Sequence, residues 1–343
     1  MRYIGSKNSL LGFIENVVAE QCPGSRSFVD LFSGTAVVGR RFKEWGFEVT
    51  SNDLLRFSYA IARAVIQNNS APRFEGLPIG KCENPLAATI KRLNALPPEL
   101  GFVTRHYAPG NGAERTYLTP ENAGRIDAIR IAIEGWRASG LVTDDEFFVL
   151  LAALLDATPS VSNIAGTYGA YLKFWEPRSA KRLTLVPPPL LVSPGNHRAL
   201  NVDANAVVGG LECDILYLDP PYNERQYATN YHLLETIARW DAPELRGVTG
   251  LPARPEARSR YCSRSEAAAA LADVVCRAPA KHILLSYNSE GLVPHDAILA
   301  ILEQRGRPLV FERDYRRFRS DADRPNRAYK ANTVAERLYL VHT

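Results

Sequence analysis

The sequence of 343 residues predicts an α/β protein built on a doubly wound, mostly parallel sheet, with a C-terminal antiparallel hairpin and a largely helical insertion. Three observations support this fold class. Helix and strand patterns alternate near the N-terminus, and the same alternation resumes after residue 199. The composition, 46% hydrophobic and 23% charged, is typical of a globular protein with a substantial core.

The N-terminal part contains a helix followed by a strand–helix–strand unit. Apolar residues recur at helical spacing over 8–20, and the short apolar run at 26–32 predicts a strand that ends at a glycine-containing turn. A helix is expected over 36–45, and the alternating, β-branched stretch 47–53 predicts the next strand. This order is that of a βαβ unit.

Residues 65–198 lack this alternation and are expected to form an inserted region, so that residues 1–64 and 199–343 make up the α/β domain. Two helix starts are marked within the insertion. Proline at the first helical position after Thr119 predicts one helix. Thr143, with a glutamate three residues later, predicts the other through a capping box.

The C-terminal part supplies the remaining elements. The patterns predict strands at 199–204, 213–219, 281–288, 308–318 and 334–341, and helices at 231–240 and 265–278. The last two strands are separated by a basic segment, and we expect them to form an antiparallel hairpin.

The sequence does not predict a membrane protein, because no apolar stretch reaches the roughly 20 residues of a membrane span. The basic N-terminus MRYIGSK lacks the apolar segment of a signal peptide. The five cysteines show neither C-x-x-C pairs nor metal-ligand spacing. We therefore expect a reduced, cytoplasmic protein with no membrane contact and no metal site.

Three features follow predicted strands at the edge where open parallel sheets bind ligands. The first is the turn in FVDLFSGTAVVG, where Gly34 allows close approach of the backbone to a ligand and the following helix offers free N–H groups. Such turns also need glycine for steric reasons. The turn departs from the pattern G-x-G-x-x-G, which argues against NAD.

The second feature is Asp53, which ends the next strand. An acid at this place holds ribose hydroxyls in βαβ nucleoside sites. The alternative is that Asp53 caps a helix beginning near Leu54, since Asp is a favoured N-cap residue. We favour the ligand role because the glycine turn precedes it.

The third feature is ILYLDPPYNERQY at 215–227. Asp219 ends a strand of buried character, where a charge is costly without a partner. Pro220 and Pro221 cannot donate hydrogen bonds, but their carbonyls accept them, so Asp219 and a proline carbonyl form two acceptors suited to an NH₂ group. Tyr222 offers a flat face to a planar base. The alternative is a strand-ending turn with an incidental tyrosine.

These motifs resemble those of the D12 class of DNA adenine-N6 methyltransferases. DPPY at 219–222 resembles their catalytic motif, FVDLFSGT their cofactor loop, SND their ribose-binding acid, and RYIGSK at 2–7 their N-terminal cofactor motif. SNIAGTYGAYLK and YLDPPYNERQYATNYHLLET resemble the restriction-modification members more closely still. Ala36 stands where the cofactor loop usually carries a second glycine.

The resemblance implies S-adenosylmethionine as methyl donor and adenine N6 in a specific double-stranded DNA sequence as acceptor. It implies the following cofactor contacts: Tyr3 and Lys7 at the methionine end, Asp30 and Gly34 in the loop beneath, Asp53 at the ribose, Asp203 near the adenine, and Asp219 on the methionine side. It implies a catalytic set formed by Asp219, Pro220, Pro221 and Tyr222.

The expected mechanism activates a poor nucleophile, because the N6 lone pair of adenine is delocalised into the ring. Hydrogen bonds from the amine to Asp219 and to the Pro220 carbonyl would localise that pair. Since the target atom lies inside a duplex, the adenine would be flipped out and held against Tyr222.

Between positions 305 and 330, nine basic residues stand against four acidic ones and are interleaved with aromatic residues. Such a stretch suits a phosphate backbone, although a salt-bridged, solvated hairpin is the alternative. We expect DNA contacts from Arg313, Arg316, Arg317, Arg319 and Lys330. The insertion is expected to recognise the target sequence, and a cognate restriction endonuclease would be a genetic partner.

Three other functions stay open on the sequence alone. The same chemistry could act on RNA adenine, and cytosine N4 methylation shares the geometry but more often has serine in place of Asp219. A nucleic-acid-binding module with a degenerate catalytic site is less favoured, because Lys7 and the whole DPPY motif are intact.

Overall fold

The structure, a computed structural model, describes residues 3–80, 82–110, 112, 114–316 and 333–343. The chain divides into two compact units. The sheet unit comprises residues 3–54, 193–227 and the described part of 256–343. The helical unit comprises residues 55–192 and 228–255.

The helical unit is drawn from two segments of the chain. The first begins and ends near the boundaries expected for an insertion at 65–198, whereas the second, 228–255, was expected within the α/β domain. Helix α10 (His232–Arg239) explains its place, since it packs against α3 (Arg56–Ala62) and α7 (Asp144–Ala157) of the same unit.

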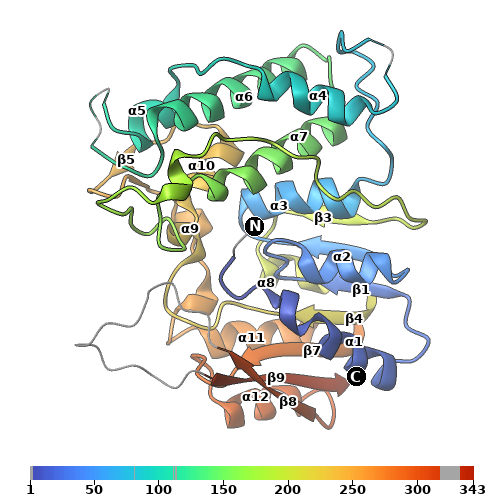
Figure 1. Ribbon diagram of the computed structural model, residues 1–343. Coiled ribbons are helices and arrows are strands. Elements are labelled where there is room, and N and C mark those ends of the chain that lie inside the picture. Colours follow the sequence, from blue (N-terminus) through green and yellow to red (C-terminus); the bar gives the residue numbers. More distant parts are fainter. Residues whose placement is uncertain (1–2, 81, 111, 113, 317–332) are drawn as a thin grey trace. The chain divides into compact units, whose positions relative to one another are not determined.

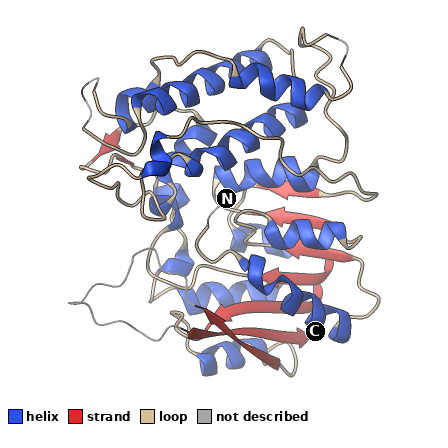
Figure 2. Cartoon of the chain, viewed as in Figure 1, coloured by secondary structure: helices blue, strands red, loops and turns tan. Residues whose placement is uncertain are grey.

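The sheet unit contains the doubly wound sheet that the sequence predicts. Its described strands lie in the order β3 (Arg198–Leu200), β2 (Glu48–Asn52), β1 (Ser27–Asp30), β4 (Cys213–Leu218), β7 (Ala280–Asn288), β9 (Thr333–His342) and β8 (Leu309–Arg316). The pairs from β3 to β7 are parallel, and β9 pairs antiparallel with both β7 and β8. The fold class and the C-terminal hairpin are therefore confirmed (Figure 2).

Helices cover both faces of this sheet (Figure 1). They are α1 (Leu11–Gln21), α2 (Val37–Glu44), α8 (Ala204–Val207), α11 (Ala267–Arg277) and α12 (His295–Leu302). Consecutive strand residues point to opposite faces. Phe28 stacks on Phe42 of α2 with ring centroids 3.8 Å apart, whereas Val29 belongs to the core formed with Val274 of α11 and Leu302 of α12.

The helical unit also contains α4 (Pro85–Asn94), α5 (Phe102–Tyr107), α6 (Pro120–Ala138) and the short strands β5 (Leu245–Arg246) and β6 (Leu251–Pro252). A π-helical turn, Arg63–Gln67, extends α3, and α9 (Tyr227–Asn230) lies at a sequence boundary of the two units. Both predicted helix starts are confirmed. The Thr119 side chain accepts a hydrogen bond from the Asn122 N–H, and Thr143 forms a capping box with Glu146. In the described part of the chain, no helix combines the length and apolar character of a membrane span.

Candidate active site

The candidate site lies where β1 and β4 end side by side in the sheet unit. After β1 the chain adds β2 and β3 on one side, and then returns to place β4 on the other side of β1. This reversal is the topological switch point, where open sheets bind ligands. Asp30 is the last residue of β1, and Asp219 directly follows β4. The Leu31 N–H donates to the Tyr217 carbonyl at 3.1 Å and fixes the two ends together.

The DPPY segment continues from β4 without helix, strand or turn. The strand ends at Leu218, so the two prolines follow the ladder and do not interrupt it. Pro220 is buried, and Tyr222 is half-buried and packs against the core that includes residues of α11. The Tyr222 carbonyl accepts from the Leu292 N–H at 3.0 Å, which holds the end of the segment.

Lys7 connects Asp219 with a residue that was not among the predicted site residues, Glu336 of β9. The Lys7 ammonium lies 3.0 Å from Asp219 Oδ1 and 2.6 Å from Glu336 Oε1. Glu336 Oε1 also accepts from the Ser286 hydroxyl of β7 at 2.7 Å. The exposed fractions are 5% for Lys7, 16% for Asp219 and 3% for Glu336, so the pairing is shielded from solvent.

The electrostatics of this cluster are unbalanced. Burial raises the pKa of Asp219 to about 6, although Lys7 opposes the rise and Glu336 adds to it. Burial also raises the pKa of Asp30 to about 8, opposed by a hydrogen bond from the Gly39 N–H. Burial lowers the pKa of Lys7, but Asp219 and Glu336 outweigh burial and hold that pKa above its ordinary value. The Lys7 ammonium therefore stays charged, and its single positive charge is shared by the carboxylates of Asp219 and Glu336.

The glycine turn after β1 brings the predicted residues Tyr3, Gly34 and Asp53 together. Gly34 has φ 52°, a left-handed conformation that favours glycine. Its N–H donates to Asp53 Oδ2 at 2.8 Å. A Cβ atom at Gly34 would lie 2.8 Å from Cε1 of Tyr3, so the Tyr3 ring packs closely against the turn. Asp30 Oδ2 accepts from the Gly39 N–H at 3.1 Å, in the first turn of α2.

Ala36 occupies the other unusual position of this turn. It is fully buried and has φ 57°, at the N-cap of α2. The left-handed conformation disfavours residues with a Cβ atom. The backbone thus keeps the geometry of a glycine although the sequence has alanine.

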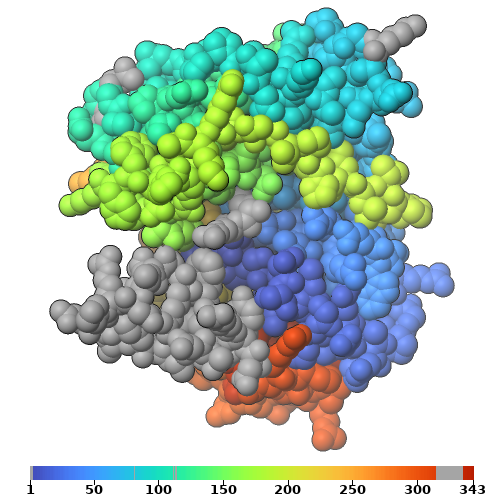
Figure 3. Space-filling model, in the orientation of Figure 1, coloured from blue at the N-terminus to red at the C-terminus, as the bar shows by residue number. Residues whose placement is uncertain are grey.

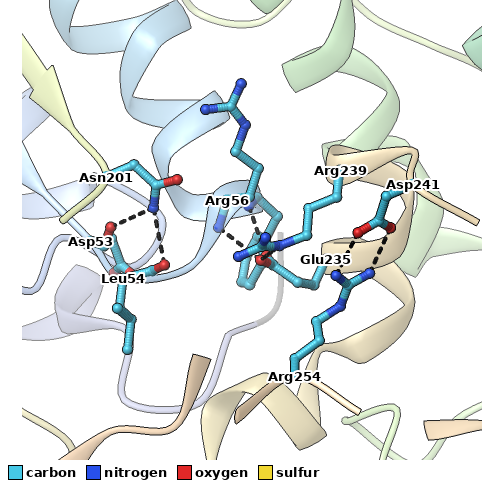
Figure 4. A network of polar contacts seen from close by, with 9 residues as sticks. Asp53, Leu54, Arg56, Asn201, Glu235, Arg239, Asp241 and Arg254 are labelled. Carbon is cyan, nitrogen blue, oxygen red and sulfur yellow. Dashed lines mark hydrogen bonds and ion pairs between the residues drawn. The ribbon is translucent and has the colours of Figure 1, made fainter. Parts of the chain in front are cut away.

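The capping alternative for Asp53 is wrong. Leu55 is the N-cap residue of α3, and the cap has no side-chain hydrogen bond. Asp53 Oδ2 accepts from the Gly34 N–H, and the Asp53 backbone is held by Asn201. Asn201 Nδ2 donates to the carbonyls of Asp53 and Leu54 at 2.8 and 3.0 Å (Figure 4).

Asp203 lies in a different local setting. Its Oδ1 accepts from the N–H groups of Asn205 and Ala206 at 3.0 and 3.2 Å, so it caps the short helix α8. It is not among the residues that line the cleft at the switch point. Its contact with the cofactor adenine stays a prediction. The capping of α8 is by itself a structural reason for an aspartate at this position.

An open cleft gathers most of the predicted cofactor residues. Its lining includes Tyr3, Lys7, Asp30, Gly34 and Asp219. Ser33 also lines this cleft, and its buried hydroxyl has no hydrogen-bond partner among the residues that the structure describes. Asp53 and Tyr222 are not part of the lining, but both contact residues that are.

Comparison with known sequences agrees with this geometry. The sequence profile of the family described as D12 class N6 adenine-specific DNA methyltransferase matches residues 3–301. The chain belongs to this family.

Curated relatives cover nearly all of the chain. It is 44% identical to the type II methyltransferase M.FokI of Planomicrobium okeanokoites over 93% of its own length and 50% of that protein. It is 38% identical to the type II methyltransferase M.NlaIII of Neisseria lactamica over 99% of both chains. It is 40% identical to the modification methylase StsI of Streptococcus sanguinis over 89% of its length and 46% of that protein. The chain thus spans about half the length of M.FokI and of StsI, and nearly all of M.NlaIII.

The structure describes only part of the predicted basic contact region of this family member. Arg313 lies on β8 and is exposed, with its guanidinium 6.0 Å from the centroid of the Phe13 ring. Arg316 is the last residue of β8. Arg317, Arg319 and Lys330 lie outside the described residues, and their DNA contacts stay predictions.

Glu336 and Ser286 are the members of the cluster that sequence reasoning missed. Glu336 lies in the predicted strand 334–341, two positions before the buried Leu338 on the same face. An acid in phase with a buried apolar residue was the available signal. Its partner Lys7 could not be identified, because 329 positions separate the two residues.

Proposed function

We propose that this chain transfers a methyl group from S-adenosylmethionine to adenine N6 in a specific double-stranded DNA sequence. It would act in the cytoplasm as the modification enzyme of a restriction-modification system, with a cognate endonuclease as genetic partner. The observation that carries the proposal is Asp219-Pro220 at the switch point of a sheet whose chain belongs to the D12 family.

The chemistry of the cleft supports this cofactor. Asp30 and Asp219 line the cleft, and the ammonium of Lys7 is shared between Asp219 and Glu336. One ammonium between the two carboxylates of Asp219 and Glu336 leaves a net negative charge, which complements S-adenosylmethionine with its two positive charges and one negative charge. The buried hydroxyl of Ser33 has no hydrogen-bond partner among the described residues, and the absence of a side chain at Gly34 lets the Tyr3 ring lie against the turn. When bound, the cofactor would supply a methyl group on a positively charged sulfur.

The proposed contacts follow from the positions of the side chains. Tyr3 and Lys7 would contact the methionine end, and Asp30 and Gly34 would form the loop beneath it. Asp53 would hold the ribose and Asp203 would lie near the adenine. Asp53 Oδ2 accepts from the Gly34 N–H, and because a carboxylate has several lone pairs it can accept from the turn and from a ribose hydroxyl together.

The chain's own residues would activate the substrate amine. With a pKa of about 6, Asp219 is mostly ionised at neutral pH and accepts a hydrogen bond from the amine. The Pro220 carbonyl accepts the second one, and the two bonds localise the nitrogen lone pair. Tyr222 holds the flipped base by stacking, and the Leu292 N–H holds the tyrosine backbone. Lys7 stays charged and orients Asp219.

Target recognition is proposed for the helical unit, which contains most of the predicted insertion. The basic side chains on and after β8, from Arg313 to Lys330, would add phosphate contacts. These would make DNA affinity strongly dependent on salt.

The test is methyl transfer from labelled S-adenosylmethionine to plasmid DNA by the purified chain, with an RNA transcript of the same sequence as comparison. We expect labelled N6-methyladenine in one sequence context of the DNA, read by sequencing. Binding of the cofactor without methylation of any DNA would overturn the proposal, and methylation of the RNA alone would replace the substrate.

A further inference from the structure

Residues 161–185 form a long irregular segment of the helical unit. A single 3-10 turn, Pro177–Ala180, is its one regular element after Val161. Figure 3 shows the segment, in yellow-green, at the surface of the molecule. A segment without ladder or helix must satisfy its backbone groups in another way or remain mobile.

Buried asparagine side chains satisfy the backbone of this segment. Asn163 is fully buried, its Nδ2 donates to the carbonyls of Leu172 and Phe174 at 3.0 Å each, and its Oδ1 accepts from the Glu176 N–H at 2.9 Å. The Leu172 carbonyl also accepts from the Thr116 hydroxyl at 2.8 Å. The stretch from Leu172 to Glu176 is therefore fixed from within the unit.

The following stretch is fixed in the same manner. Asn122 Nδ2 donates to the carbonyls of Ser179 and Lys181 at 3.1 and 2.8 Å, and its Oδ1 accepts from the Leu183 N–H at 2.8 Å. The buried guanidinium of Arg125 donates to the Leu183 carbonyl at 3.2 Å. Each side-chain amide supplies the backbone hydrogen bonds that a neighbouring strand would otherwise supply. The segment is therefore ordered in the absence of a partner.

The ordered backbone presents apolar side chains to solvent. Phe174 is 63% exposed and Trp175 is 44% exposed, and Lys173 beside them is exposed as well. Adjacent large aromatic residues on a fixed, exposed backbone indicate an interaction surface. Aromatic side chains also lose little conformational entropy on contact, because they have only two side-chain torsions.

The charge around the aromatic pair indicates the chemistry of the partner. Between positions 171 and 182 the basic residues are Lys173, Arg178, Lys181 and Arg182, and the one acidic residue is Glu176. Positive charge interleaved with exposed aromatic rings fits a nucleic acid, whose phosphates pair with the cations and whose bases stack on the rings.

We propose that residues 172–176 form a preformed DNA-contacting loop in which Phe174 and Trp175 stack on bases and Lys173 contacts a phosphate. This inference rests on the proposed function, because the flipping of a base out of the duplex exposes the faces of the bases next to it. Side chains inserted at such a step stabilise the opened duplex. The hydrogen bonds of Asn163 keep the rings in place without a rearrangement of the loop.

The experiment compares the full-length wild type with the double variant Phe174→Ala/Trp175→Ala. Plasmid DNA and labelled S-adenosylmethionine are the probes. We expect the KM for DNA to rise about tenfold or more, the loss of at least one base stack, while the KM for the cofactor and the melting temperature stay unchanged. Lys173→Ala should reduce the slope of affinity against salt by about one.

Matched variants separate stacking from general apolar contact. Phe174→Tyr/Trp175→Phe keeps both rings and should retain the wild-type KM, whereas Phe174→Leu/Trp175→Leu should behave as the alanine variant does. Leu100→Ala/Val248→Ala removes exposed apolar side chains elsewhere in the helical unit and should leave the KM unchanged.

A KM for DNA equal to that of the wild type in the double alanine variant would overturn the inference. Equal KM values for the leucine and aromatic variants would overturn the stacking role. Failure of the wild type to methylate any DNA is a different result, because it contradicts the proposed function and not this loop alone.

Discussion

The two units of the chain use buried carboxylates in opposite ways. In the helical unit, Asp127 is fully buried and accepts from the N–H groups of Gly101, Val103 and Thr104 and from the Thr104 hydroxyl, at 2.6–3.1 Å. In the sheet unit, Asp30 is almost as buried and has one backbone donor, from Gly39. Asp219 shares a single ammonium with Glu336.

Glu235 extends the comparison. This fully buried residue of α10 accepts from the N–H groups of Arg56 and Phe57 at 3.1 and 3.0 Å, and pairs with Arg239 at 2.6 Å (Figure 4). It thereby caps α3 from outside the helix. Asp127 and Glu235 each accept from three or more donors, although burial still raises the pKa of Asp127. The carboxylates at the switch point have fewer donors and keep acceptor capacity for a ligand.

The largest expected effect is that of Asp219→Asn. The amide can still pair with neighbours but cannot stabilise positive charge on the substrate amine, so kcat should fall by about 10³-fold or more. The melting temperature should stay near that of the wild type, because the amide oxygen can still accept from Lys7 and the ammonium keeps its pairing with Glu336. Methyl transfer and thermal unfolding measure the two effects. Near-normal turnover would remove Asp219 from the mechanism.

Asp127→Ala should show the reverse pattern. It leaves several buried donors without an acceptor, and we expect a loss of about 3 kcal/mol in the free energy of unfolding. Turnover per folded molecule should be retained at low temperature. Denaturant unfolding gives the stability, and an unaltered midpoint would contradict the division into structural and functional carboxylates.

Glu336→Gln tests whether Glu336 raises the pKa of Asp219. Glu336 raises the pKa of Asp219, so its neutralisation should move the acid limb of the kcat profile to a pH below about 6. We expect a loss of turnover of about tenfold at neutral pH, because Lys7 is then held by Asp219 alone.

The matched control for this variant is Glu312→Gln on the neighbouring strand. Glu312 pairs with Arg337 at 2.6 Å and is half exposed. Its neutralisation should leave the pH profile in place. A shift of equal size in both variants would show that net charge, and not the buried pairing, is responsible.

Asp30→Asn should flatten the dependence of stability on pH. The pKa of Asp30 is raised to about 8 in the folded chain, so the folded state binds the proton more tightly than the unfolded chain does. The contribution of Asp30 to the free energy of unfolding is fully present below the ordinary pKa of an aspartate. It is lost as pH rises through about 8, at up to roughly 1.4 kcal/mol per pH unit. Melting temperatures between pH 5 and 9 should fall for the wild type and less for the variant. Parallel curves would disprove the shift.

The smallest expected effect separates two glycines. Gly34 has φ 52° and Gly140 of the helical unit has φ 67°, so alanine at either should cost about 1 kcal/mol of stability. A Cβ atom meets the Tyr3 ring at Gly34 but nothing within 4 Å at Gly140. Only Gly34→Ala should weaken the binding of S-adenosylmethionine, measured by calorimetry. Equal cofactor affinities would contradict the role of the turn.

Much of the fold could be predicted because local patterns specify it. The apolar run that forms β4, the capping box at Thr143 and the turn at Gly34 each depend on residues close in sequence. Sequence position also placed Asp30 and Asp219 at one sheet edge, since parallel strands end together.

The rest depends on contacts between distant residues. Sequence order does not show that 228–255 joins the helical unit through α10, or that Asn163 fixes the backbone around Phe174. The left-handed φ of Ala36 is a further case, because alanine by itself gives no indication of that conformation. Asp203 was identified as a cofactor residue, yet its visible partners are the N–H groups of α8.

The ion pair of Lys7 and Glu336 has a consequence for protein synthesis. The two residues are 329 positions apart, so on the ribosome Lys7 is made on the order of tens of seconds before its partner. During that interval the lysine has no Glu336 to offset its burial, and β9 is not yet in the sheet. The cluster around Asp219 therefore becomes complete only when translation has passed Glu336. A chain released before that position would carry every recognisable motif and still lack a finished active site.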